Sequence, residues 1–200
     1  IFLGYIIKNS NIGEDTAIGI IFSSFFALGF VLISVLEVTV NLEDLLFGQI
    51  LAVSRFDVFI ILGMCISVVS LITIFFKQLV FYSFDPVGAE VKGLNTNFLN
   101  YLFLVLLSVS IVASLQSVGI ILVLSLLLIP AASAKLVTNT FHSSIFVSIL
   151  FGLISSVSGL YCSYFLNLPS GPSMSLMASL IFIICFFINK IKKNVAFLNN

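Results

Sequence analysis

The sequence predicts an all-α fold, a polytopic transmembrane helical bundle, and both its composition and its long apolar segments support this. Hydrophobic residues make up 60% of the 200 residues and charged residues only 8%, whereas about a quarter of the residues in a soluble domain are charged. The long segments are apolar on every side, as helices surrounded by lipid or by other helices must be. The formal net charge is zero, so no nucleic-acid partner is expected. We expect one membrane domain over residues 1–200, with the lipid bilayer around it.

A helix that crosses a bilayer needs about 20 mostly apolar residues, and several segments provide them. The opening run IFLGYII ends almost as soon as it begins, and we interpret it as the tail of a truncated N-terminal helix. After it, six complete spans are expected at residues 17–36, 57–76, 98–115, 119–134, 143–165 and 173–189.

The third and fourth spans are separated because residues 93–134 carry no formal charge. At about 1.5 Å per residue, one helix of this length would be about twice as long as the bilayer core is thick. We therefore expect a turn at Gln116-Ser117-Val118-Gly119 and a bend at Pro130. Residues 167–172 separate the last two spans, and Pro172 suits the first position of the last helix.

The distribution of charge tests the count of spans, since positive residues collect on the cytoplasmic side. Six complete spans place all the lysines on one side and only Arg55 on the other. A single pass through residues 93–134 would remove this asymmetry. The count places the stretch YSFDPVGAEVKGLN, residues 82–95, in the cytoplasm. On the outer side, residues 42–53 have apolar residues at helical spacing over a length too short to span, and we expect an interfacial or re-entrant helix there.

The cytoplasmic stretch contains the signals of a short helix. Asp85 can cap such a helix, Pro86 can be its first residue, and Gly93 can end it one or two turns later. A capped surface helix of this kind can dock on a soluble partner. The stretch can equally be a solvated connector, and the residues alone leave both interpretations open.

Residues that could carry chemistry are few. The sequence contains no GxxxxGK[ST] phosphate loop, no paired carboxylates and no Ser/His/Asp set placed for catalysis, so the chain is not expected to be an enzyme. His142 has no partner at HxxxH or CxxC spacing and is interpreted as a solvated interfacial side chain. Cys65, Cys162 and Cys185 are far apart and are interpreted as small packing residues.

Polar and small residues inside the spans have a structural interpretation. Hydroxyl and amide groups there can form hydrogen bonds between helices without binding a metal strongly. The side chains concerned are Ser125, Ser133, Ser155 and Gln116. On the fifth span, the pairs Gly152-x3-Ser156 and Ser155-x3-Gly159 offer close-packing faces. These faces can pack against a second copy or against other helices of the same chain.

Five motifs occur in order along the chain. They are GEDTAIGIIFSSFFALGFVLIS, LFGQILAVSRFD, FDPVGAEVKGL, SVGIILVLSLLLIPAASAKL and YFLNLPSGPSMSLMASLIF. Together they resemble the membrane permease subunits of ABC importers for zinc, manganese and related divalent metals, such as the ZnuB-like zinc permeases. The resemblance implies the ABC importer permease architecture in the plasma (inner) membrane of a bacterium.

The resemblance also implies a mechanism and a set of partners. Residues 84–94 would form the coupling helix that docks on a separate ATP-hydrolysing subunit, and Asp85, Pro86, Ala89 and Gly93 are the residues that match the family there. ATP would be bound by that subunit, so no cofactor is expected on this chain. A permease homodimer and an extracytoplasmic metal-binding protein are further implied partners. The implied cargo is a divalent metal, zinc first, with manganese, iron or a siderophore or cobalamin as alternatives.

The outer side carries four acidic residues whose role the sequence leaves open. They could attract a divalent cation or receive the metal-binding protein, or they could only keep an outer loop hydrated. These residues are Glu37, Glu43, Asp44 and Asp57. Family members also carry an Asp and a His in a span before the EDTAIGI motif, so the residues of the metal pathway are not assigned here.

Two functions of other classes compete with transport. An intramembrane enzyme would need ionisable groups that face a cavity, and the predicted spans have none deep inside. A structural membrane protein without transport activity would have no ATPase bound to residues 84–94.

Overall fold

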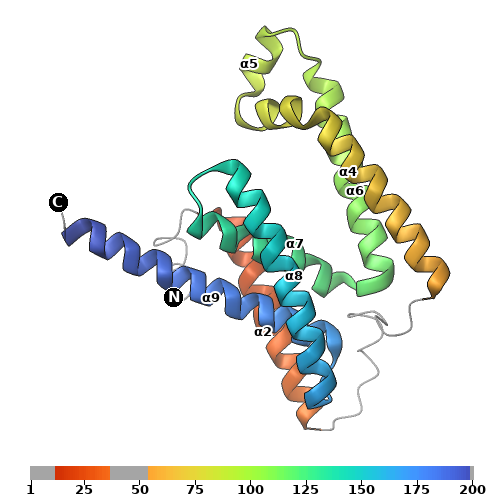
Figure 1. The fold of residues 1–200 in the computed structure, drawn as a ribbon, viewed down its shortest axis with the longest axis vertical. Coiled ribbons are helices and arrows are strands. Elements are labelled where there is room, and N and C mark those ends of the chain that lie inside the picture. Colours follow the sequence, from red (N-terminus) through yellow and green to blue (C-terminus); the bar gives the residue numbers. More distant parts are fainter. Residues whose placement is uncertain (1–11, 37–53, 199–200) are drawn as a thin grey trace. The chain divides into compact units, whose positions relative to one another are not determined.

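The computed structural model describes residues 12–36 and 54–198, and the regular elements in these ranges are all α-helices. They are α2 (Glu14–Val35), α4 (Arg55–Phe84), α5 (Pro86–Val91), α6 (Thr96–Val118), α7 (Ile120–Val137), α8 (Phe141–Leu166) and α9 (Ser170–Leu198) (Figure 1). The all-α expectation is confirmed for this part of the chain. Helices α2, α7, α8 and α9 form one compact unit, and α4, α5 and α6 form a second.

Five of these helices are long and apolar enough to cross a membrane: α2, α4, α6, α8 and α9. The remaining expected span, residues 119–134, corresponds to α7, which has 18 residues. At about 1.5 Å per residue it is about 27 Å long, slightly less than the hydrocarbon core of about 30 Å. Each expected span therefore coincides with a helix, while the number of complete spans stays a prediction.

The break expected within residues 116–119 is present, although it is shorter than a four-residue turn. Helix α6 continues to Val118 and α7 begins at Ile120, so Gly119 alone separates them. Its φ of +81° lies in a region that glycine adopts readily and other residues rarely do. One glycine is therefore enough to interrupt the helical backbone.

The break before the last helix lies where the sequence predicts it, but α9 begins earlier than the expected span. Asn167 ends α8 in the left-handed conformation, with φ 52°, which asparagine tolerates better than most residues. Helix α9 begins at Ser170, so Pro172 is its third residue and not its first. The proline is still compatible with the helix because the first backbone N–H groups of a helix have no partner within it.

Two helices extend well past the expected spans. Helix α4 runs to Phe84 instead of residue 76, and α9 runs from Ser170 to Leu198 instead of over residues 173–189. The expected ends were set by the loss of hydrophobicity. Backbone hydrogen bonding does not depend on hydrophobicity, so a helix can continue out of the apolar region until a capping signal such as Asp85-Pro86 ends it.

In the first unit, α9 is the central helix and packs against α2, α7 and α8. Its apolar core gathers side chains from α2, α7 and α9 and the residue Ile12 just before α2. The cluster comprises Ile12, Ala17, Ile20, Ile129, Ala132, Ala178, Phe182 and Phe186. Each of the three helices contributes one alanine to the cluster, and α9 adds its two aromatic side chains, Phe182 and Phe186.

Hydroxyl groups within this unit are satisfied by hydrogen bonds. The hydroxyls of Ser125 on α7 and Ser175 on α9 lie 2.6 Å apart, which confirms the expectation of an interhelical bond for Ser125. Ser133 instead donates to the Ile129 carbonyl of its own helix, at 2.7 Å, as a serine in an apolar span commonly does. Among the described residues, no buried side-chain nitrogen or oxygen lacks a partner.

Small residues bring α8 and α9 into close contact. Ser155 and Gly159 of α8 are buried. A Cβ on Gly159 would overlap the Met174 Cα of α9 and lie 2.7 Å from its backbone nitrogen. No heavy atom lies within 4 Å of a Cβ placed on Gly152. The Ser155 and Gly159 face therefore packs within this chain, which was one of the two open interpretations.

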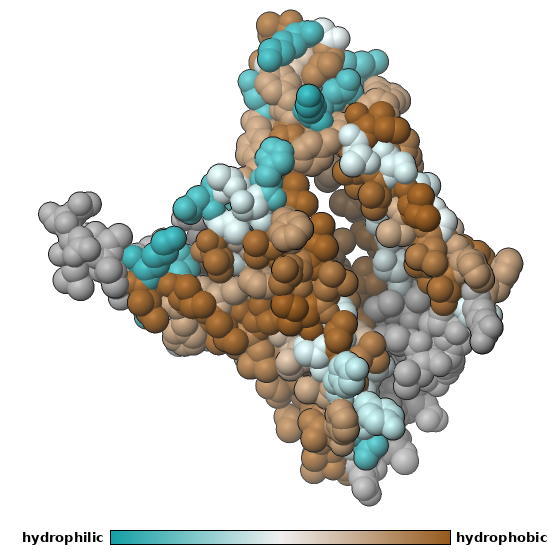
Figure 2. Space-filling model, viewed as in Figure 1, coloured by the Kyte–Doolittle hydropathy of each residue, from teal (hydrophilic) through white to brown (hydrophobic). Residues whose placement is uncertain are grey.

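The second unit consists of two long helices joined by a short one. The rings of Phe75 on α4 and Phe98 on α6 are 5.9 Å apart in an edge-on arrangement, and α5 packs against α4. Much of the apolar surface of α4 is exposed, including Phe59 and Ile74, and such a surface suits lipid or other helices. Figure 2 shows hydrophilic residues gathered at the α5 end of this unit and hydrophobic ones along the α4 helix.

Candidate functional site

The short helix α5 is the best-defined candidate site, and its first turn is built by Asp85. The Asp85 carboxylate Oδ1 accepts a hydrogen bond from the Gly88 N–H at 2.8 Å, and Pro86 is the first helical residue. An N-cap carboxylate satisfies a backbone N–H that the helix itself cannot, and proline has no N–H to satisfy. A Cβ on Gly88 would overlap the Asp85 carboxylate, so the cap also depends on the glycine.

The last turn of α5 is ended by Gly93. Its φ is +78°, its N–H donates to the Glu90 carbonyl at 2.9 Å, and the Leu94 N–H donates to the Ala89 carbonyl at 3.0 Å. This is the arrangement by which a glycine just past a helix satisfies the last free carbonyls. The helix start at Asp85-Pro86 and the stop at Gly93 are thus both confirmed.

The exposed surface of α5 is apolar. Val87 and Val91 are one turn apart, on the same side of the helix, and their exposed fractions are 72% and 84%. Ala89 lies on the opposite side with an exposed fraction of 0%. Two branched aliphatic side chains on a charged, hydrophilic segment form a surface that a partner protein could cover. We call Val87 and Val91 the valine pair.

The four residues matched to a coupling helix therefore have structural roles within the segment. Asp85 and Pro86 start the helix, Gly93 ends it, and Ala89 is its buried residue. The large hydrophobic side chains that α5 exposes are those of the valine pair, which were not selected from the sequence. The i, i+4 spacing of valines within PVGAEV is the signal that could have identified them.

The outer acidic residues are only partly covered by the structure. Glu37, Glu43 and Asp44, together with the expected interfacial or re-entrant helix, lie outside the described residues. Asp57 lies in the first turn of α4, where its Oδ2 accepts a hydrogen bond from the Ser54 N–H at 3.1 Å. Asp57 thus forms a capping box with Ser54, a role that the sequence analysis did not assign. The cation entrance stays a prediction.

Metal-binding groups are scattered over the described residues. No group of three or more His, Cys, Asp or Glu side chains that could hold a metal ion occurs among them. His142 is the second residue of α8, and its ring lies edge-on to that of Phe141. Cys65, Cys162 and Cys185 are free thiols, of which only Cys185 is buried, so the packing interpretation suits Cys185 and not Cys65.

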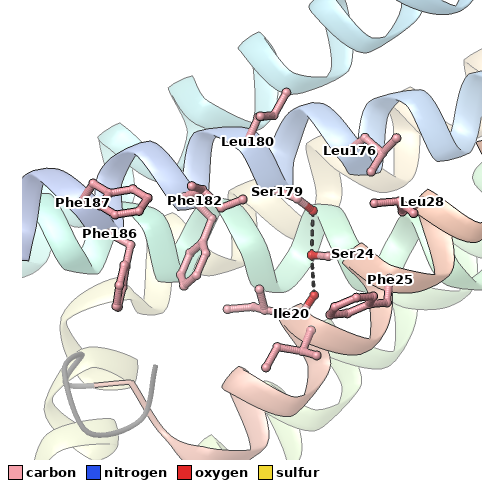
Figure 3. A pocket seen from close by; sticks show the side chains of 12 residues that line it. Ile20, Ser24, Phe25, Leu28, Leu176, Ser179, Leu180, Phe182, Phe186 and Phe187 are labelled. Carbon is pink, nitrogen blue, oxygen red and sulfur yellow. Dashed lines mark hydrogen bonds between the residues drawn. The ribbon is translucent and has the colours of Figure 1, made fainter. Parts of the chain in front are cut away.

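A second candidate is an apolar cavity of about 600 Å³ between α2 and α9 (Figure 3). Its lining includes Phe25, Phe182 and Phe187, and its only hydroxyls are those of Ser24 and Ser179. These two hydroxyls lie 2.7 Å apart, and Ser24 also bonds to the Ile20 carbonyl at 2.6 Å, as the dashed lines in Figure 3 show. Since its polar atoms already bond to each other and it has no charged group, the cavity is not suited to a cation.

Comparison with known proteins agrees with these features. The profile of the ABC 3 transport family matches residues 1–189. The manganese transport system membrane protein MntC of Listeria innocua is 47% identical over 184 residues, which are 92% of this chain and 66% of the relative. The manganese import system permease protein ScaB of Streptococcus gordonii is 46% identical over 188 residues, which are 94% of this chain and 68% of the relative.

More distant and structural relatives give the same picture. A probable iron transport system membrane protein of Haemophilus influenzae is 37% identical over 180 residues, which are 88% of this chain and 63% of the relative. A solved structure described as PsaBC from Streptococcus pneumoniae in complex with Fab contains a chain that is 44% identical, with a TM-score of 0.72. The match covers 97% of this chain and 71% of that one.

The chain spans about two thirds of the length of the curated relatives it matches. These relatives are named for transport and not for catalysis, in agreement with the expectation that the chain is not an enzyme. With five helices of sufficient length and apolarity, it is a multi-pass integral membrane protein of the bacterial plasma membrane. The family match over nearly all residues confirms the resemblance seen in the five motifs, and the chain belongs to the ABC 3 transport family.

Proposed function

We propose that the chain is the membrane permease subunit of an ATP-driven importer of Mn²⁺. The observation that carries the ATP-driven part is α5, a capped six-residue helix between two long apolar helices that presents an apolar pair to its surroundings. Such a helix has no evident role in a protein that acts alone, because exposed valines on a hydrophilic segment gain free energy only when they are covered.

In this proposal α5 is the coupling helix. The valine pair, Val87 and Val91, packs into a groove of a separate ATPase subunit, while Asp85 and Gly93 fix where the helix begins and ends. ATP binding and hydrolysis change the shape of that groove and so displace α5. The displacement shifts the permease between an outward-open and an inward-open state, each favoured by a different nucleotide state of the partner.

Manganese replaces zinc as the proposed cargo. The sequence motifs favoured zinc first and kept manganese as an alternative. The relatives that are 46–47% identical are named for manganese, and one named for iron is 37% identical. Because the described residues contain no cluster of metal ligands, the choice of metal rests on these relatives and not on coordination geometry.

The remaining partners follow from the same assignment. A second permease copy completes the pathway between two subunits, and an extracytoplasmic metal-binding protein delivers the ion. The acidic residues of the outer side are proposed to attract the cation or the delivery protein; they are Glu37, Glu43, Asp44 and Asp57. Asp57 would have this role in addition to capping α4.

Metal contents of cells test the proposal. Deletion of the complete gene in its bacterial host is expected to lower cellular manganese several-fold in low-manganese medium, with restoration by the gene on a plasmid. Zinc and iron are measured in the same samples by mass spectrometry. If cellular zinc or iron fell while manganese was unchanged, the cargo would be that metal instead. If no metal changed, the proposal that the chain takes part in metal import would be contradicted.

A further inference from the structure

A single residue, Asp85, joins α4 to α5. Helix α4 ends at Phe84 and α5 begins at Pro86, and Asp85 is both the C-cap residue of α4 and the N-cap residue of α5. Its N–H donates to the Phe81 carbonyl at 3.0 Å, and its own carbonyl accepts from the Ala89 N–H at 3.0 Å. The beginning of α5 is therefore fixed to the end of α4 by the backbone itself (Figure 1).

The other end of α5 is also attached to α4, but through a side chain. Lys92 is the C-cap residue of α5, and its Nζ lies over the ring of Phe81, 4.3 Å from the ring centroid. Phe81 lies in the last turn of α4. A lysine ammonium at this distance over an aromatic ring is attracted by the negative face of the ring. The contact thus connects the end of α5 back to the residue whose carbonyl holds Asp85.

The Asp85 junction and the Lys92 contact together attach both ends of α5 to α4. Without Lys92, α5 would be held by the Asp85 junction and by the packing around the buried Ala89, and rotation about the backbone at Asp85, which changes the angle between the two helices, would be less restricted. With Lys92 on Phe81, both ends of α5 are fixed, and the angle is set. On the other side, Asn95 caps α6 through a bond from the Phe98 N–H at 3.0 Å.

We propose that Lys92 is a positioning residue that holds α5 at a fixed angle to α4 through the Phe81 ring, so that displacement of α5 is passed to α4. This inference rests on the proposed function, in which a partner ATPase displaces α5. Asp85 and Glu90 are the carboxylates near Lys92 in the sequence, and the Phe81 ring is the group over which its ammonium lies. Lys92 therefore acts through α4 and not on the metal ion.

The expected effect is moderate, because Lys92 is exposed. An exposed cation–π contact biases an equilibrium by about two- to fivefold. In the reconstituted complete transporter with its ATPase, Lys92→Met and Phe81→Leu should each lower the number of Mn²⁺ ions imported per ATP hydrolysed by about two- to fivefold. The double variant should be no worse than either single one. Co-purification of the ATPase should be unchanged.

Conservative variants separate positioning from a merely structural role. Lys92→Arg and Phe81→Trp keep a cation over an aromatic ring and should retain the wild-type ratio. Lys135→Met, which removes a lysine from the last turn of α7, is the matched control and should also retain it. Loss of ATPase co-purification in Lys92→Met, failure of Lys92→Arg to restore the ratio, or additive effects in the double variant would overturn the proposal.

A measurement that does not depend on transport completes the test. Spin labels on cysteines at positions 77 and 90, with the three native cysteines replaced by serine, report the distance between α4 and α5. Lys92→Met should broaden the distance distribution, and an unchanged distribution would overturn the proposal. If the wild-type transporter imported no Mn²⁺ while the distribution still broadened, the proposed function would fail and the role of Lys92 in holding α5 would stand.

Discussion

At the scale of single residues, Gly159 shows how tightly α8 and α9 pack. A Cβ at this position would overlap the Met174 backbone, whereas a Cβ on Gly152, two turns earlier on the same helix, meets nothing within 4 Å. Backbone atoms of a packed helix cannot move aside as a flexible side chain can. The two glycines therefore differ in what they contribute, although both belong to small-residue pairs in the sequence.

We predict that Gly159→Ala lowers the stability of the protein in detergent by about 1–3 kcal/mol, the usual cost of overpacking. Gly152→Ala is the matched control and should have no effect or a slightly stabilising one, since alanine favours helix over glycine. The midpoint of thermal unfolding reports both. Equal midpoints for the two variants would show that α8 and α9 do not approach as closely as described.

The sequence predicted some residue roles and missed others for a physical reason. Asp85, Pro86 and Gly93 were identified because capping depends on neighbours within a few residues. Which side of α5 is buried, that of Ala89 or that of Val87, depends on what the helix packs against. The i, i+4 spacing places the two valines on one side of α5, but in a six-residue helix it does not show whether that side is buried, so the exposure of the valine pair is seen only in the structure.

At the scale of elements, α5 depends on a conformation that only some residues accept. Gly93 has a φ of +78°, and holding a branched residue there costs about 1–3 kcal/mol. We predict that Gly93→Val lowers manganese accumulation several-fold while membrane insertion is retained, because the end of α5 is displaced. Gly93→Asn should have a smaller effect, since asparagine tolerates the left-handed region.

Manganese accumulation, ATPase activity and the amount of protein in the membrane are measured together for these two variants. Full accumulation in the Gly93→Val variant would count against the assignment of α5 as the coupling helix.

A second prediction for elements concerns the bond between α7 and α9. The Ser125 and Ser175 hydroxyls are buried and 2.6 Å apart. Interhelical hydrogen bonds in membrane proteins contribute about 0.6 kcal/mol on average. A double-mutant cycle with Ser125→Ala and Ser175→Ala, followed by denaturant unfolding, should give a coupling energy of about this size. Strictly additive effects would mean that the two hydroxyls do not bond in the protein.

Elements were predicted more reliably than their ends. Every expected span coincides with a helix, because about 20 consecutive apolar residues have few other options in a membrane. The ends of α4 and α9 were placed too early, since hydrophobicity marks where the bilayer stops and not where hydrogen bonding stops. The break at Gly119 was located because the length of an uncharged run limits a single span.

At the scale of the whole molecule, the sidedness of the chain is the central prediction. Cysteines introduced at positions 90 and 135, after replacement of the native ones, should react with a membrane-impermeant maleimide only when the cytoplasmic side is exposed. A cysteine at position 55 should react from outside, because six spans place Arg55 opposite the lysines. Reaction of position 135 from outside would contradict the turn near Gly119 and the six-span topology that depends on it.

The family could be inferred from sequence at this scale, and the cargo could not. Five ordered motifs depend on residues that lie along the whole chain, and the family match covers residues 1–189. Metal choice depends on the number and geometry of ligands around the ion. The described residues provide no such group, so zinc and manganese could not be distinguished from the motifs.

The shared residue Asp85 has a consequence for how this chain can change over evolutionary time. A helix turns by about 100° per residue, so inserting or deleting one amino acid beside Asp85 would re-aim the valine pair toward a different side. A substitution near this junction changes which side chain is present, whereas an insertion or deletion changes the direction in which the valine pair points. Natural variation in the length of the chain is therefore expected elsewhere.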